Sequence, residues 1–173
     1  AFCECKNLSS VFVSEGVEVI GQNAFRACAS LTSIALPASV EEVGAAAFFQ
    51  CQAMKSAAFT SGGKKVKLGD NMFTQCRYLM RVTLPRSIDR IGEGMFQDCL
   101  MLSGVEIPDG ADSIGASAFA SCSGFTTVVI PASVTTIGIA AFSACSLADI
   151  YYTGTKAQWE GIRKLGDTAT AVS

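Results

Sequence analysis

A motif of 23 residues repeats along the chain, and this period restricts the fold more than any other feature of the sequence. Its most regular part is Ala/Met-Phe-x-x-Cys, which occurs seven times. The phenylalanines are Phe2, Phe25, Phe48, Phe73, Phe96, Phe119 and Phe142, and the cysteines are Cys5, Cys28, Cys51, Cys76, Cys99, Cys122 and Cys145. Successive phenylalanines are 23 residues apart, except for one interval of 25. This period predicts a solenoid in which each repeat forms one coil and stacks on the next.

Each repeat also contains an alternating apolar segment that predicts a short strand. Ile34 with Leu36 is one example, and the series includes residues 11–13 and 105–107. Apolar residues at every second position indicate a strand with one buried face. A proline directly follows four of these segments, and proline cannot donate the next ladder hydrogen bond. We therefore expect seven equivalent strands to line up as one parallel sheet.

A glycine at one fixed place in the repeat predicts an unusual backbone there. The six positions are Gly21, Gly44, Gly69, Gly92, Gly115 and Gly138. Glycine is favoured where φ is positive or where two backbones approach too closely for a Cβ atom. We expect a short helical turn carrying Phe-x-x-Cys to follow the glycine and close each coil.

Stacked coils place equivalent side chains in columns, so the sequence predicts buried columns of phenylalanines and of thiols. Structural zinc sites use cysteine pairs separated by two to four residues, whereas these thiols recur once per repeat. A column of small apolar thiols is therefore expected, with no metal. Neighbouring thiols come within disulfide range, but their parallel orientation argues against bonding. Cys3 lies outside the column and is reactive if it is exposed.

The pattern Leu-x-x-Ile-x-Leu-Pro-x-x-Val-x-x-Val/Ile-Gly-x-x-Ala-Phe-x-x-Cys, as in residues 31–51, resembles the BspA-like (Treponema pallidum type) leucine-rich repeats. The resemblance covers residues 1–152. It implies a leucine-rich-repeat solenoid, a right-handed β/α superhelix of about seven coils. The parallel sheet forms the concave face and short turns or helical turns form the convex face. Members of this family are mostly surface or secreted proteins implicated in adhesion, and they share no catalytic residues.

The repeat pattern suggests two parts, residues 1–152 and residues 153–173. Residue 1 falls inside a motif and no signal peptide precedes it, so we expect a truncated first coil in a piece of a longer protein. The third repeat has two extra residues within 60–65, which predicts a bulge and a looser register between coils.

Residues 153–173 are expected to form a capping helix and a frayed tail, because the last coil of a solenoid needs a cover. Thr155 and Gln158 fit a capping box, while Trp159 and Ile162 share one helix face. Gly166 is the predicted stop of the helix. Residues 167–173 are predicted to fray.

Positive charge is concentrated in the middle of the chain. Residues 55–90 hold eight basic and two acidic residues, although the net charge of the whole chain is −2. Like charges on adjacent strands are unfavourable without a counter-anion, so the exposed face of the sheet is a candidate anion-binding surface. An unevenly charged, solvated surface is the alternative. The candidate ligand-binding residues are Lys55, Met80, Arg81, Thr83, Glu106, Lys64, Lys65 and Arg86.

The chain contains no histidine and no recognised catalytic layout, so we expect no enzyme, no catalytic residues and no cofactor. The predicted function is recognition of a protein or glycan, with anionic ligands included, by a secreted or cell-surface protein. An intracellular (cytoplasmic) protein–protein scaffold is the alternative, because secreted proteins usually couple their cysteines. Exposed aromatics for base stacking are scarce and no apolar run spans a bilayer. We therefore expect a monomer without nucleic-acid binding or membrane insertion.

Overall fold

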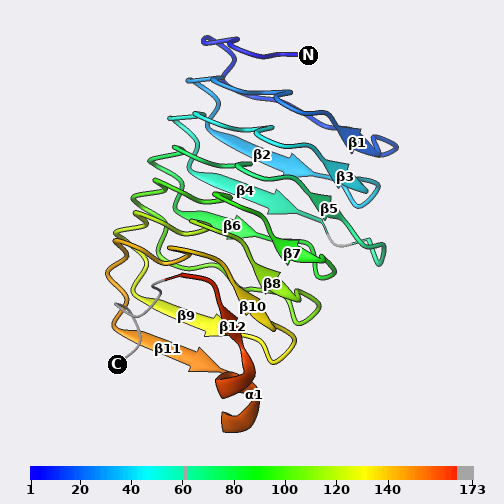
Figure 1. Ribbon diagram of the computed structural model, residues 1–173. Coiled ribbons are helices and arrows are strands. Elements are labelled where there is room, and N and C mark those ends of the chain that lie inside the picture. Colours follow the sequence, from blue (N-terminus) through cyan, green and yellow to red (C-terminus); the bar gives the residue numbers. More distant parts are fainter. Residues whose placement is uncertain (61, 167–173) are drawn as a thin grey trace.

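The structure is a computed structural model that describes residues 1–60 and 62–166, and it confirms the predicted solenoid. The coils stack on one another from the N-terminus to a helix near the C-terminal end (Figure 1). It has about six turns, one fewer than predicted. Apart from the C-terminal helix, the described coils are closed by short turns and contain no α-helix, so of the two predicted forms, short turns or helical turns, the structure has the short turns.

Two lines of parallel strands run along the solenoid. The first line consists of β2 (Ser33–Leu36), β4 (Ser56–Phe59), β6 (Arg81–Thr83), β9 (Thr127–Ile130) and β11 (Asp149–Tyr152). The second line consists of β1 (Val19–Ile20), β3 (Glu42–Val43), β5 (Lys67–Leu68), β7 (Arg90–Ile91), β8 (Ser113–Ile114), β10 (Thr136–Ile137) and β12 (Arg163–Lys164). Every pairing between these strands is parallel, as expected when equivalent segments of successive coils meet.

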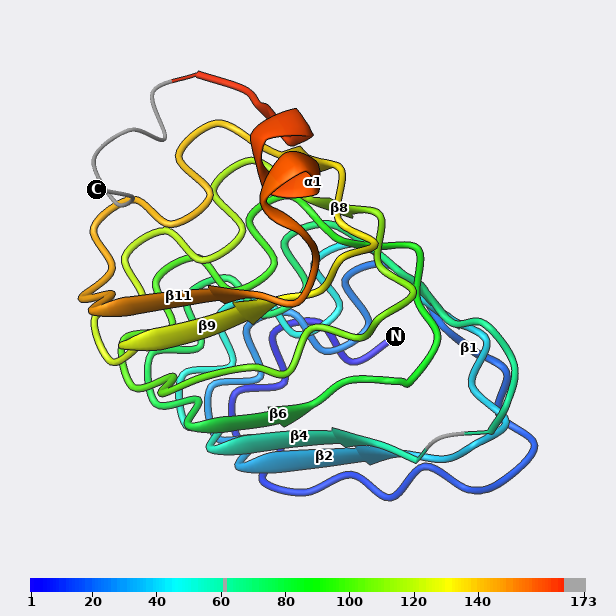
Figure 2. The same ribbon diagram turned by 90° about the horizontal axis from the view of Figure 1, so that it is seen from below.

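The first line is divided into two sheets, β2-β4-β6 and β11-β9, which corrects the prediction of one seven-stranded sheet. Figure 2 shows these two groups separated along the stack. Residues 11–13 and 105–107 form no strand. Residues 11–13 belong to the first coil, which has a neighbour on one side only. Before the other segment, Gly104 stands where other coils begin their strands with a larger residue, and glycine is depleted in strands.

The second line is interrupted after β5, next to the two-residue insertion in the third repeat. Strands β3 and β5 stay in register, with Glu42 opposite Lys67. The next contact is a single bridge between Val66 and Ile88, which are one residue closer in sequence than the 23-residue repeat requires. The predicted loosening of register is therefore confirmed, but it is confined to this bridge.

The turns opposite the first line use left-handed backbone at two places in each coil. One place is two residues after the repeat glycine, as at Ala46 (φ 54°), and the other is two residues after the phenylalanine, as at Gln50 (φ 59°). Alternate N–H groups then donate to the next coil, for example Phe48 N–H to the carbonyl of Met72 at 3.0 Å. The turns therefore hold neighbouring coils together by a ladder of backbone hydrogen bonds.

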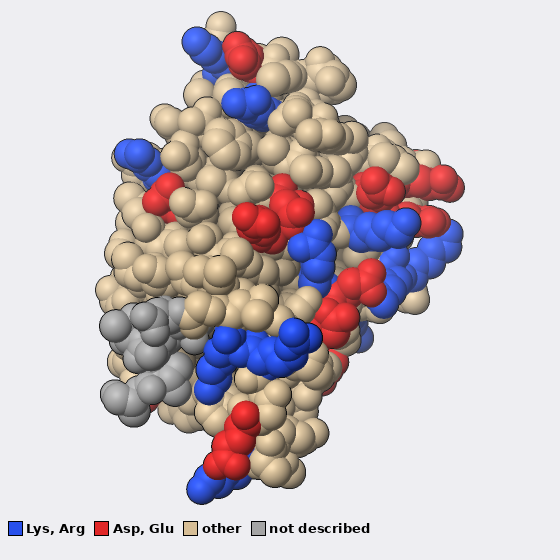
Figure 3. Space-filling view, in the orientation of Figure 1, with Lys and Arg blue, Asp and Glu red and all other residues tan. Residues whose placement is uncertain are grey.

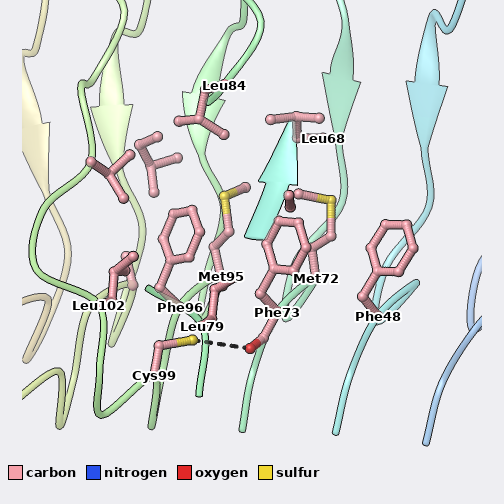
Figure 4. Close-up of a cluster of buried hydrophobic side chains, with 14 of the residues drawn as sticks. Phe48, Leu68, Met72, Phe73, Leu79, Leu84, Met95, Phe96, Cys99 and Leu102 are labelled. Atoms are coloured by element: carbon pink, nitrogen blue, oxygen red, sulfur yellow. Dashed lines mark hydrogen bonds between the residues drawn. The ribbon is translucent and has the colours of Figure 1, made fainter. Parts of the chain in front are cut away.

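The predicted column of phenylalanines is confirmed. Rings from successive coils lie 5.3 to 5.8 Å apart between centroids, with interplanar angles of at most 18°. Figure 4 shows Phe48, Phe73 and Phe96 side by side, with Met72 and Met95 packed next to them. The four central rings, from Phe48 to Phe119, are completely buried. These rings form a core that is continuous from coil to coil.

The thiol column is also confirmed, and its hydrogen bonds explain why cysteine suits this position. All eight cysteines are free, and those from Cys28 to Cys122 are buried. From Cys28 to Cys145, each column thiol donates to the phenylalanine carbonyl of the preceding coil, as Cys99 does to Phe73 at 3.2 Å (Figure 4). That carbonyl also accepts the Cys76 backbone N–H at 3.0 Å. The thiol therefore supplies a second donor to a buried carbonyl, which has two lone pairs.

The repeat glycines are required by close approach rather than by positive φ. None of the six has a left-handed backbone. At Gly44, Gly69, Gly115 and Gly138, a Cβ atom would lie closer than 3.0 Å to backbone atoms of the preceding coil. At Gly21, in the first coil, it would meet nothing within 4 Å.

Gly69→Ala is expected to destabilise the protein by about 1–3 kcal/mol, because the coils must separate to make room for the methyl group. Gly21→Ala is the matched control, and it should be neutral or slightly stabilising because the site is open and alanine restricts the unfolded chain. Urea unfolding of both variants measures the difference. Equal stabilities would show that this glycine is not required for close stacking.

The C-terminal segment covers part of the last coil. Helix α1 (Lys156–Gly161) begins with the predicted capping box of Thr155 and Gln158. The Trp159 ring lies 5.3 Å from that of Tyr152, and Ile162 is buried. The helix ends at Gly161 rather than at Gly166, because the chain continues into β12, which pairs with β10. The predicted frayed tail, residues 167–173, lies outside the described residues.

Candidate functional site on the strand face

The predicted neighbours Lys55 and Arg81 do lie on adjacent coils. The Lys55 carbonyl accepts the backbone N–H groups of Met80 at 2.9 Å and of Arg81 at 3.3 Å. All three side chains are exposed: Lys55 and Met80 directly precede β4 and β6, and Arg81 is the first residue of β6. Neither Lys55 nor Arg81 forms an ion pair within the described part of the chain. Their charges are therefore available to a ligand.

Lys64 and Lys65 are exposed as well, but each is paired with an acidic residue of a neighbouring coil. Lys64 pairs with Glu41, and Lys65 pairs with Asp89. The hydrogen bond to Glu41, with its negative charge, raises the pKa of Lys64 above its ordinary value. Figure 3 shows the two signs of charge side by side along the edge of the molecule where the loops between the strand lines lie. An anionic ligand would have to compete with these carboxylates.

The same edge contains a third ion pair, in which Arg90 donates to Asp70 at 2.8 Å. Burial alone would raise the pKa of Asp70, but hydrogen bonds from Arg90 and from the Glu93 N–H lower it below its ordinary value. Asp70 thus stays charged and links the two coils on either side of the break in the second line of strands. Several basic residues in the middle of the chain therefore join neighbouring coils through ion pairs, which the number of charges in the sequence does not reveal.

Three other candidates come together where the first line of strands is divided. Thr83, Arg86 and Glu106 line an open hollow of about 580 Å³ together with Val82, Leu84, Pro108 and Asp109. Strand β6 pairs with β4 on one side and with no strand of the described residues on the other. An unpaired strand edge presents free backbone N–H and C=O groups. The hollow therefore combines a cation, two carboxylates and unpaired backbone beside an apolar floor.

Arg86 links this hollow to a smaller one. The smaller hollow has a volume of about 160 Å³ and is lined by Gly62, Gly63, Lys64, Pro85, Arg86 and Ser87. The structure thus brings the candidates into two adjoining groups, one around Lys55 and Arg81 and one around Arg86. Lys65 is held apart by its ion pair with Asp89.

Several exposed residues were not predicted as functional from the sequence. Pro108 and Asp109 line the larger hollow, and Tyr78, Leu100 and Met101 are large apolar side chains exposed to solvent. Tyr78, Leu100 and Met101 could have been found from the sequence because they depart from the repeat. Other coils carry small or polar residues at the same positions. Within the described residues, no group of three or more His, Cys, Asp or Glu side chains could hold a metal ion.

The fold is shared with solved bacterial structures. A leucine-rich repeat protein from Bacteroides ovatus is 25% identical, with a TM-score of 0.80 over 97% of this chain and 48% of that one. One from Eubacterium ventriosum is 29% identical, with a TM-score of 0.72 over 82% and 38% of the two chains. The Treponema pallidum leucine-rich repeat protein is 23% identical, with a TM-score of 0.61 over 80% and 74%.

This chain thus spans about half the length of the Bacteroides protein and less of the Eubacterium protein. A search among curated proteins finds no match. In the part of the chain that the structure describes, no helix has the length and apolar character needed to cross a bilayer.

Six copies of the BspA type leucine rich repeat region match residues 1–67 and 64–161. The matches cover every strand except β12, the phenylalanine and thiol columns and helix α1. Proteins with leucine-rich repeats are generally non-enzymatic recognition modules, and those of the BspA type are often associated with the cell surface. The chain belongs to the BspA-type leucine-rich repeat family.

Proposed function

We propose that the chain is a non-enzymatic recognition module of a cell-surface or secreted protein, and that it binds a protein or a glycan through the strand face. The observation that supports this most strongly is the adjacent, exposed pair Lys55 and Arg81, which has no ionic partner in the described residues. Like charges side by side cost free energy, and a bound anionic group would remove that cost. The large hollow beside β6 extends the same surface.

Reversing the two charges should therefore weaken binding. The probes are an array of anionic and neutral glycans and a panel of purified mucin and matrix proteins, read by biolayer interferometry. We expect at least one anionic probe to bind the native chain, and the variant Lys55→Glu/Arg81→Glu to bind it at least tenfold more weakly. Both side chains are exposed, so the fold should be unaffected.

The matched control is Lys6→Glu/Arg163→Glu, which makes the same change in net charge at exposed positions in the first coil and in the second line of strands. This control should keep the affinity of the native chain. Equal losses in both variants would mean that only net charge matters. A panel in which no probe binds better to the native chain than to the charge-reversed variant would refute the proposal.

An intracellular scaffold is the second candidate, and the eight free cysteines favour it. Oxidising compartments usually couple cysteines, although five of these are buried and each donates to a carbonyl. Labelling intact cells with a biotin reagent that cannot cross membranes separates the two locations. Labelling before lysis supports surface exposure, and labelling only after lysis supports the scaffold.

A further inference from the structure

Four large apolar side chains are exposed on two adjacent coils, at the corner that leads into the first line of strands. They are Tyr78, Met80, Leu100 and Met101, and their exposed fractions range from 38% to 61%. The Met101 N–H donates to the carbonyl of Arg77 at 3.3 Å, so the two corners lie next to each other. The backbone bond from Met80 to Lys55 extends the group to a third coil. We call these four residues the corner patch.

Coil packing does not require these side chains. Tyr78 and Met101 occupy one repeat position, which is Ser30, Ala53 or Gly124 in other coils. The position of Leu100 is Ala29, Gln52 or Ser123 in other coils. Since the coils with small residues stack in the same way, the large side chains add exposed apolar surface and no necessary core contact. Contiguous exposed apolar surface of this kind is typical of interaction sites.

The rim of the corner patch is positively charged. Lys55, Arg77 and Arg81 are exposed and form no ion pair within the described ranges. Residues 77–81 and 100–103 contain no Asp or Glu. The composition resembles the centre of a protein–protein interface, where aromatic residues, Met and Arg are enriched. Binding energy in such interfaces is concentrated in a few apolar or arginine anchors.

We propose that the corner patch docks a protein segment that presents one or two apolar anchor side chains flanked by Asp or Glu. The anchors would cover Tyr78, Leu100 and Met101, while the carboxylates would pair with Arg77 and Arg81. A neutral glycan would leave Lys55, Arg77 and Arg81 unpaired. This inference rests on the proposed function, because it specifies the partner of a surface that includes Lys55, Met80 and Arg81.

A displayed library of random 12-residue peptides tests the proposal. The library is selected on the native chain and counter-selected on Tyr78→Ala/Leu100→Ser/Met101→Ala, which restores residues found at the same positions in other coils. We expect the enriched peptides to combine aromatic or aliphatic residues with Asp or Glu. A representative synthetic peptide should bind the triple variant at least tenfold more weakly, and replacing its Asp and Glu by Lys should abolish binding.

Two controls keep the result specific. Val19→Thr removes an exposed apolar side chain from the second line of strands and should leave peptide affinity unchanged. As the second control, the triple variant should melt within a few degrees of the native chain. The single variant Met101→Ala should also bind the peptide more weakly than the native chain does.

The outcomes separate the patch from the wider strand face. Peptides without acidic residues, no enrichment over the triple variant, or equal affinity for that variant would overturn the corner-patch proposal. If binding is lost in Lys55→Glu/Arg81→Glu but kept in the triple variant, the strand face binds a partner and the patch does not. Self-association of the native chain that the triple variant abolishes would identify a second copy as the occupant, which also contradicts an acidic partner.

Discussion

Phe96→Ala is expected to reduce the free energy of unfolding by about 3–5 kcal/mol, because it opens a cavity in the middle of the stack. The Phe96 ring is fully buried, and its centroid lies 5.8 Å from that of Phe73 and 5.3 Å from that of Phe119. The loss of this side chain weakens two interfaces between coils at once. In a solenoid, each interface contributes directly to the stability of the array.

Urea unfolding followed by circular dichroism measures this loss. Phe2→Ala is the matched control from the same column, because Phe2 lies in the first coil, stacks on one ring only and is 51% exposed. Its removal should cost clearly less than the removal of Phe96. A loss below about 1 kcal/mol for Phe96→Ala is too small for a filled core position and would contradict the buried column.

The second large effect is a loss of stability at alkaline pH. Burial raises the pKa of Cys51 from 9.0 to about 12, and it raises the pKa of Cys76 and of Cys99 well above the ordinary value. The folded chain therefore holds these protons more tightly than the unfolded chain does. The resulting stabilisation is complete below pH 9 and is lost as the pH rises through the folded-state values. Within this window, each of these thiols lowers the free energy of unfolding by about 1.4 kcal/mol for every unit by which the pH rises.

Urea unfolding at intervals from pH 7 to pH 11 tests the effect under reducing conditions. The stability should be nearly constant from pH 7 to pH 8.5, and it should then fall steeply. The variant Cys51→Ala/Cys76→Ala/Cys99→Ala should begin less stable, because three carbonyls lose a donor, but it should show a shallower alkaline slope. Identical slopes would show that the thiols are not buried.

The repeat allowed most of the architecture to be predicted from the sequence. A fixed period implies stacking, and stacking implies the phenylalanine and thiol columns without further information. The capping box of Thr155 and Gln158 was predictable because its residues are local in sequence. The division of the first line of strands was not predicted, because one weak position, Gly104, changes the pairing of a whole segment. The left-handed turns were also missed, because residues such as Ala46 and Gln50 carry no conformational signal.

The candidate site was predicted less completely, because its ion pairs join residues that belong to different coils. Lys55 and Arg81 were correctly placed on adjacent coils, although the register sets Arg81 opposite Ser56 and Lys55 lies just before β4. The pairing of Lys64 with Glu41 was missed, although the two residues are one repeat apart and a comparison of adjacent coils could have found it. The hollow around Arg86 depends on the divided sheet, so it could not be predicted from an ideal repeat. Whether the candidate residues bind a ligand stays a prediction.

Alkylation of the native protein at pH 8, followed by mass spectrometry of each cysteine, tests the stacked core most directly. Cys3 and Cys5 are exposed, whereas the thiols from Cys28 to Cys122 are buried between coils. We predict rapid modification of the first two, intermediate modification of Cys145 and none of the buried five until the chain unfolds. Modification of Cys51, Cys76 or Cys99 at the rate of Cys3 in the folded protein would contradict the stacked core.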